Sequence, residues 1–199
     1  PLELIEEHDL TTMVGCNMRF HPAIQAAKAC LEDDRIGTVV SARIEGGSYL
    51  PDWHPEEDYR EMYSAKKGIG GATLDYIHEI NYAQWLFGDI AAVSAMVGDA
   101  SSLEIETEDT AAIVSRTATD QIVEFHLDYV QRDYNRSYEI TGEEGTLRWE
   151  WDQPTVQRYD PQSETWIAES AWDDWEMNQM YIDEIEHFLS RVADNRETV

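Results

Sequence analysis

A stripe of four polar residues runs along a mainly apolar segment between residues 71 and 88. The four are Asp75, His78, Glu79 and Tyr82. If the segment is a helix, their spacing puts them all on one face. Polar groups on a buried helix must meet a partner or line a cavity. A histidine beside a carboxylate can transfer a proton near neutral pH, which makes His78 and Asp75 a candidate catalytic pair.

Two other roles for this stripe remain open. His78 and Asp75 can form a purely structural hydrogen bond inside the fold. Two carboxylates and one histidine can also bind a metal ion, but the sequence has no third group of ligands, so we expect no metal site.

Candidate ligand-binding residues lie in two other segments. Asn17 and Arg19 follow an apolar run expected to be a buried parallel strand, and ligands bind beyond the carboxyl ends of such strands. Arg19 can clamp a carboxylate or phosphate, or pair with a nearby acid. The long segment 50–67 combines aromatic and basic side chains that suit a sugar ring, or that pack the loop onto its own domain. Its candidates are Trp53, Tyr59, Tyr63 and Lys66.

The elements that position these residues change in character along the chain. Residues 2–9 indicate a helix and 11–16 a short strand, typical of the end of a βαβ unit. We therefore expect residues 1–18 to be the remnant of a dinucleotide-binding domain and 19–199 to form a second, substrate-binding domain. In that domain a helix should begin at Pro22, followed by a strand over 39–49 and a helix over 72–87.

The second half of the chain shows the period of two that marks strands. Val123, Phe125 and Leu127 alternate with polar residues, as in an antiparallel sheet with one buried face. Strands are expected over 92–97, 110–116, 121–130, 137–141, 146–151 and 155–159, with a last helix over 174–193. The predicted fold class is α+β: an open, mostly antiparallel sheet with helices packed on one face.

Composition limits the function classes. The 199 residues include 41 Asp and Glu against 14 Lys and Arg, a formal net charge of -27. Nucleic acid is not expected as a partner, because phosphate binding needs a basic surface. Acids used for binding substrate or metal are one explanation of this charge. We favour adaptation to high salt, because the acids are scattered along the whole chain. No apolar run is long enough to span a membrane, and we expect a cytoplasmic protein of a salt-adapted organism.

Several segments, in order, resemble the Gfo/Idh/MocA family of oxidoreductases. The segment 14–22, Val-Gly-Cys-Asn-Met-Arg-Phe-His-Pro, resembles the family's Asn-x-Arg-Phe-x-Pro segment. Gly70-Gly71, Asp75, His78 and Leu86-Phe87-Gly88 resemble its Gly-Gly…Asp…His…Leu-Gly motif, with Asp-x-x-His here where many members have Asp-x-x-x-His. Residues 142–147, Gly-Glu-Glu-Gly-Thr-Leu, resemble its Gly-x-x-Gly-x-Leu turn.

The resemblance implies an NAD- or NADP-dependent oxidoreductase acting on a hydroxyl or keto group of a sugar or sugar derivative. It makes His78 the acid–base residue, with Asp75 orienting it or sharing that role, and places Asn17 and Arg19 near nicotinamide and substrate. It also implies that the cofactor is bound mainly by a Rossmann domain preceding this chain, and that subunits pair through the sheet as a dimer or tetramer. The alternative is a non-enzymatic sugar-binding or oligomerisation module.

Overall fold

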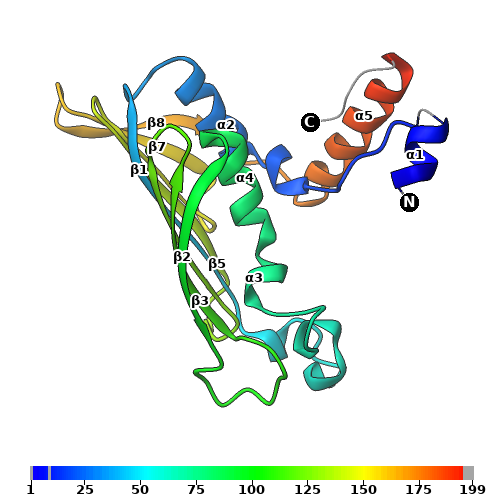
Figure 1. The fold of residues 1–199 in the computed structure, drawn as a ribbon. Coiled ribbons are helices and arrows are strands. Elements are labelled where there is room, and N and C mark those ends of the chain that lie inside the picture. The colour runs from blue at the N-terminus through cyan, green and yellow to red at the C-terminus, as the bar shows by residue number, and fades with distance from the viewer. Residues whose placement is uncertain (1, 9, 195–199) are drawn as a thin grey trace.

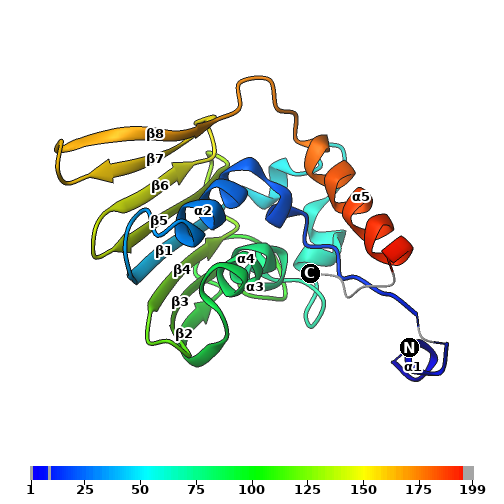
Figure 2. The same cartoon turned by 90° about the horizontal axis from the view of Figure 1, so that it is seen from above.

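The computed structural model describes residues 2–8 and 10–194. Within this part of the chain, eight strands form one open sheet in the order β2-β3-β4-β1-β5-β6-β7-β8 (Figures 1 and 2). The pair β1–β4 is parallel and every other neighbouring pair is antiparallel. The strands are β1 (Val39–Gly47), β2 (Ile90–Gly98), β3 (Thr110–Thr117), β4 (Ile122–Asp128), β5 (Asn135–Gly142), β6 (Thr146–Glu150), β7 (Thr155–Asp160) and β8 (Thr165–Ala171).

Helices cover one face of this sheet. In both views α2 (Pro22–Glu32), α3 (Ala72–Asp75) and α4 (Ile77–Phe87) lie on the same side of it. The helices α1 (Leu2–His8) and α5 (Asn178–Asp194) lie farther from the sheet on that side. Short 3-10 turns link these elements: η1 (Asn17–Phe20), η2 (Leu50–Asp52), η3 (Tyr59–Glu61) and η4 (Tyr63–Ala65). No helix among the described residues has both the length and the apolar composition to cross a membrane.

The core lies between the helices and the covered face. Along β4, Val123, Phe125 and Leu127 are buried, while Glu124 and His126 are exposed on the other face. This alternation follows from the pleat of a strand, which turns successive side chains to opposite faces. The predicted α+β class, with an open and mostly antiparallel sheet, is confirmed.

Three details of the prediction are wrong. Residues 10–16 form neither helix nor strand; a strand there would need neighbours to pair its backbone groups, and the described chain supplies none. The helix expected over 72–87 is broken at Tyr76 into α3 and α4. The strand β8 was not predicted, because adjacent Trp166 and Ile167 disrupt its alternation. Positions 1, 9 and 195–199 of the two predicted domains lie outside the described residues.

Gly46 in β1 permits a close approach between the broken helix and the sheet. A Cβ atom at this position would lie 2.7 Å from the ring of Tyr76 and 3.3 Å from the carboxyl carbon of Glu79. Both contacts are tighter than ordinary van der Waals packing, so any side chain here would push the start of α4 away from β1. Glycine at position 46 therefore sets the distance of the polar stripe from the sheet.

This packing predicts that Gly46→Ala destabilises the protein by about 1–3 kcal/mol, because an added methyl group overpacks the contact. The matched control is Gly98→Ala in β2, where an added Cβ would have nothing within 4 Å. The control should change the free energy of unfolding by less than about 0.5 kcal/mol. Urea unfolding measures both; equal effects at the two positions would contradict this account of Gly46.

Candidate active site

The break at Tyr76 gives the members of the polar stripe different surroundings. Asp75 is the last residue of α3, and His78 lies in the first turn of α4. The backbone of Tyr76 leaves the helical region, with φ -94° and ψ 27°, and its hydroxyl lies 2.6 Å from the Oγ of Ser48. Asp75 and His78 thus stand at the junction of two short helices above β1.

The carboxylate of Asp75 bonds one tyrosine hydroxyl and acts on a second tyrosine through its charge. The hydroxyl of Tyr129 donates to Asp75 Oδ2 at 2.6 Å, and the backbone N–H of Gly71 donates to the same hydroxyl at 3.2 Å. Burial raises the pKa of Tyr63, and the negative charge of Asp75 adds to this effect. Tyr129, a core residue, therefore fixes the carboxylate of Asp75. Tyr63, in the segment 50–67, lies within range of the charge of Asp75.

His78 is half-buried and favours its neutral form. Burial lowers the pKa of its imidazole, the positive charge of Arg136 lowers it further, and the negative charge of Asp75 opposes both. Its Nδ1 is buried and has no hydrogen-bond partner in the described part of the chain, and no hydrogen bond joins Asp75 to His78 there. Asp75 thus acts on His78 through its charge, and the neutral imidazole can accept a proton.

Glu79 belongs to the core. Its carboxylate Oε1 lies 2.7 Å from Nη1 of Arg136, and both side chains are largely buried. Arg136 stands opposite Gly46 in the β1–β5 ladder, and its Nε donates to the hydroxyl of Tyr134 at 2.8 Å. Burial raises the pKa of Glu79 to about 7, against the lowering effect of Arg136. The other stripe member, Tyr82, is also fully buried, and its hydroxyl has no partner among the described residues.

The aromatic segment 50–67 folds back onto the site. The Nε1 of Trp53 donates to Ser48 Oγ at 2.7 Å, and the ring of Trp53 meets Tyr129 edge-on at 5.5 Å. The hydroxyl of Tyr59 accepts from the backbone N–H of Glu104 at 3.2 Å. Trp53 and Tyr59 thus pack the loop against the domain, although the sequence also allowed them to bind a ligand directly.

Of the four candidate residues in the segment 50–67, Tyr63 and Lys66 keep side-chain surface that is free to contact a ligand. Tyr63 is 56% exposed, and Lys66 makes a long contact of 3.5 Å with the exposed Glu61. The structure therefore divides the four loop candidates into an inner pair that packs and an outer pair that can reach a ligand.

Asn17 and Arg19 lie in η1, beside α4. The Nε of Arg19 donates to Asn81 Oδ1 at 2.8 Å, and its guanidinium lies 5.7 Å from the ring centre of Trp85. Asn81 is one helical turn beyond His78, so this hydrogen bond connects Arg19 to the helix that carries His78. Asn17 is buried, and its Oδ1 has no partner among residues 2–8 and 10–194.

Tyr129 was not among the site residues predicted from the sequence. It lies at the end of the strand predicted over 121–130, two residues after Leu127, a spacing that indicates only a place on the same buried face. A buried tyrosine still needs a partner for its hydroxyl, which was the available signal. That partner, Asp75, lies 54 residues earlier in the chain, so the sequence could not identify it.

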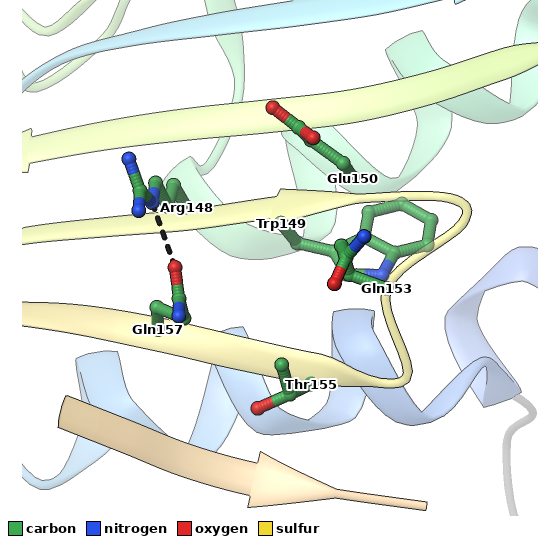
Figure 3. A pocket seen from close by; sticks show the side chains of 6 residues that line it. All are labelled: Arg148, Trp149, Glu150, Gln153, Thr155 and Gln157. Carbon is green, nitrogen blue, oxygen red and sulfur yellow. Dashed lines mark hydrogen bonds between the residues drawn. The ribbon is translucent and has the colours of Figure 1, made fainter. Parts of the chain in front are cut away.

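The uncovered face of the sheet also carries shallow pockets. One of about 240 Å³ lies between β6 and β7, where Arg148 donates to Gln157 at 2.9 Å (Figure 3). Its lining residues are Arg148, Trp149, Glu150, Gln153, Thr155 and Gln157, and none of them was predicted as a site residue. No group of three or more His, Cys, Asp or Glu in the described chain is arranged to hold a metal ion.

Comparisons with known proteins agree with this fold. The family model of the GFO/IDH/MocA C-terminal domain matches residues 24–148, and the chain belongs to this family. Levoglucosan dehydrogenase of Pseudarthrobacter phenanthrenivorans is 32% identical over 98 residues, which cover 48% of this chain and 24% of that enzyme. The 2,7-anhydro-N-acetylneuraminate hydratase of Escherichia coli K12 is 26% identical over 93 residues, covering 47% of this chain and 24% of that protein.

A solved structure of levoglucosan dehydrogenase in complex with NADH has the same fold. It superposes with a TM-score of 0.85 at 19% identity and covers 98% of this chain. The present chain spans 60% of the length of that structure. The match therefore establishes the fold of this domain.

The buried ion pair at the base of the site predicts a pH-dependent loss of stability in Arg136→Met. Glu79 would be left buried without its cation, at a cost of about 3–5 kcal/mol. Its folded pKa of about 7 lies above the usual 4.5, so the folded state keeps this proton longer than the unfolded chain, and stability falls as the pH rises between these values. Without Arg136 the folded pKa rises further, and the deficit should widen above about pH 7.

The control for this variant is Arg43→Met, also on the sheet. Arg43 pairs with Glu124 at 3.3 Å, but both side chains are exposed. Its replacement should cost less than about 1 kcal/mol at any pH. Urea unfolding between pH 5 and pH 9 measures both variants, and a deficit in Arg136→Met that shrinks with rising pH would contradict the assignment.

Proposed function

We propose that this chain is the substrate-binding part of an NAD- or NADP-dependent oxidoreductase that acts on a hydroxyl or keto group of a sugar or sugar derivative. Membership of the GFO/IDH/MocA family supports the class of reaction. The observation that carries the proposal is the site at the α3–α4 junction: His78 favours its neutral form, and the fixed carboxylate of Asp75 lies close enough to act on its charge. This arrangement suits transfer of a hydroxyl proton.

His78 accepts the proton of the reacting hydroxyl when the sugar is oxidised and returns it in the reverse direction. The negative charge of Asp75 supports the imidazolium that forms. Tyr63 and Lys66 contact the sugar from the loop, while Trp53 and Tyr59 hold that loop against the domain. Bound NAD or NADP supplies the hydride acceptor or donor.

The residues of this chain fit one edge of such a cofactor. Asn17 has a buried Oδ1 with no partner among the described residues, which suits an amide donor from the cofactor or a hydroxyl from the substrate. Arg19, held by Asn81, adds positive charge beside it. We assign the remainder of the dinucleotide site to a further domain outside this chain.

The helix α5 supports the idea of a further domain. Three of its apolar residues, Tyr181, Ile185 and Leu189, follow one another at helical spacing and are 47%, 54% and 57% exposed. A row of exposed apolar residues on an ordered helix marks a contact surface. We propose that the dinucleotide-binding domain covers this face.

The proposed role of His78 predicts that His78→Ala in the full-length protein lowers turnover by about 10²–10⁴-fold, because the proton acceptor is lost. Reduction of NAD and NADP is measured with a panel of sugars and sugar acids. The control is His126→Ala, since His126 is half exposed on the opposite face of the sheet and should leave turnover unchanged. Unchanged turnover in His78→Ala would remove His78 from the mechanism.

We further propose that the uncovered face of the sheet pairs with a second copy of this chain. A groove of about 460 Å³ there is lined mainly by apolar surface of β2, β3 and β4, including Met96, Ala112 and Val114. Met96 is 82% exposed and Val114 is 48% exposed. Apolar side chains gathered on an open sheet are normally covered by a partner, and a homo-oligomer closed by symmetry meets that need.

This pairing predicts that Met96→Glu shifts the full-length protein from dimer or tetramer to a smaller species, because it buries a charge in the interface. The matched control is Val93→Glu on the same strand. Val93 is 66% exposed but pairs with the buried Ser115, so it faces the helix side of the sheet. Light scattering coupled to gel filtration reports both masses; a monomeric wild type, or equal shifts in both variants, would refute the pairing.

A further inference from the structure

Tyr129 occupies a central place among the elements of the site. It follows directly after β4 and is fully buried. Its hydroxyl donates to Asp75 Oδ2 at 2.6 Å and accepts from the backbone N–H of Gly71 at 3.2 Å. A single hydroxyl therefore joins both ends of α3, the turn that begins it and the carboxylate that ends it.

The rest of Tyr129 is fixed just as firmly. Its backbone N–H donates to the carbonyl of Asp109 at 2.9 Å, and its carbonyl accepts from Leu50 at 3.0 Å. Its ring meets the edge of Trp53 at 5.5 Å, with the rings perpendicular. Leu50 and Trp53 belong to the segment 50–67, so any shift of this segment reaches Asp75 through the ring and hydroxyl of Tyr129.

The hydroxyl of Tyr129 stays a donor across the physiological pH range. Burial raises the pKa of Tyr129, and the hydrogen bond to Asp75 and its negative charge raise it further. One carboxylate oxygen of Asp75 is thereby held by a neutral donor, which fixes its orientation without neutralising its charge. That charge is the one that favours the protonated form of His78.

Tyr138 shows what a purely structural tyrosine looks like in the same sheet. It too is almost fully buried on the helix side, but its hydroxyl donates to the backbone carbonyl of Ala23 at 2.9 Å. Tyr129 differs because its acceptor is a half-buried, ionisable side chain beside a candidate catalytic histidine.

We propose that Tyr129 is a positioning residue, which fixes the carboxylate of Asp75 for proton transfer at His78 and couples it to the seating of the segment 50–67. This inference rests on the proposed function, because it assumes that His78 transfers the proton.

The test compares Tyr129→Phe, Asp75→Asn, the double variant and the control Tyr138→Phe in the full-length protein. Tyr129→Phe should lower kcat by about 10- to 100-fold, because the carboxylate loses its fixed place, and change KM by less than about threefold. The double variant should turn over no more slowly than Asp75→Asn alone, since both changes remove the same interaction. Tyr138→Phe should keep the wild-type kcat.

A conservative variant guards against a simple failure to fold. Placing 4-aminophenylalanine at position 129 keeps the ring and a donor at the same place, and it should restore most of the kcat lost in Tyr129→Phe. Additive losses in the double variant, equal losses in Tyr138→Phe, or no rescue by the amino group would overturn the positioning role.

Hydrogen exchange read by mass spectrometry tests the same claim without turnover. Residues 68–76 should exchange faster in Tyr129→Phe and at the wild-type rate in Tyr138→Phe, because the hydroxyl of Tyr129 bonds Gly71 and Asp75, whereas that of Tyr138 bonds the carbonyl of Ala23. If the wild type oxidises or reduces no sugar, the proposed function fails, and the exchange data still decide whether Tyr129 fixes α3. Unchanged exchange in Tyr129→Phe would overturn the inference.

Discussion

The site depends on one close contact, the approach of the α3–α4 junction to β1 at Gly46. Because Gly46 has no side chain, the ring of Tyr76 and the carboxyl of Glu79 can lie almost on the strand backbone. At that distance Glu79 reaches Arg136, which is paired with Gly46 across the β1–β5 ladder. A buried cation is thus fixed beneath the helix, where its charge acts on His78 one residue away from Glu79. Packing at one glycine therefore sets the place of the candidate base and of Arg136, whose charge adds to burial in favouring the neutral form of His78.

We propose separate functions for the two faces of the sheet, catalysis on the covered face and subunit pairing on the uncovered face. The covered face carries the proposed acid–base pair: Tyr129 bonds Asp75, and Arg136 pairs with Glu79 next to His78. The uncovered face carries apolar residues of β2 and β3, with shallow polar pockets over β6 and β7. A period of two in the strands produces this division, since neighbouring side chains serve opposite faces. A subunit can then pair through one face and leave the other free for catalysis.

Local patterns predicted most of the elements, and failures occurred where distant partners decide the structure. The alternation in β4 and the final helix, α5, needed only neighbouring residues and were identified correctly. The break at Tyr76 carries no glycine or proline; it accompanies a bond from its hydroxyl to Ser48 in another element. The apolar run 11–16 had the composition of a strand but no strand to pair with. For the site, the helix period grouped Asp75 with His78. Tyr129 follows β4 and Arg136 lies in β5, and no local pattern connects either of them to that helix.

The central claim is that a sugar hydroxyl binds at the α3–α4 junction, within reach of His78. A crystal structure of the full-length protein with NAD or NADP and a bound sugar or polyol tests it most directly. The account predicts a ligand hydroxyl within hydrogen-bond distance, about 2.6–3.2 Å, of a ring nitrogen of His78, with Tyr63 or Lys66 beside the ligand. A sugar bound instead on the uncovered face of the sheet, or held beside the nicotinamide with His78 out of reach, would contradict it.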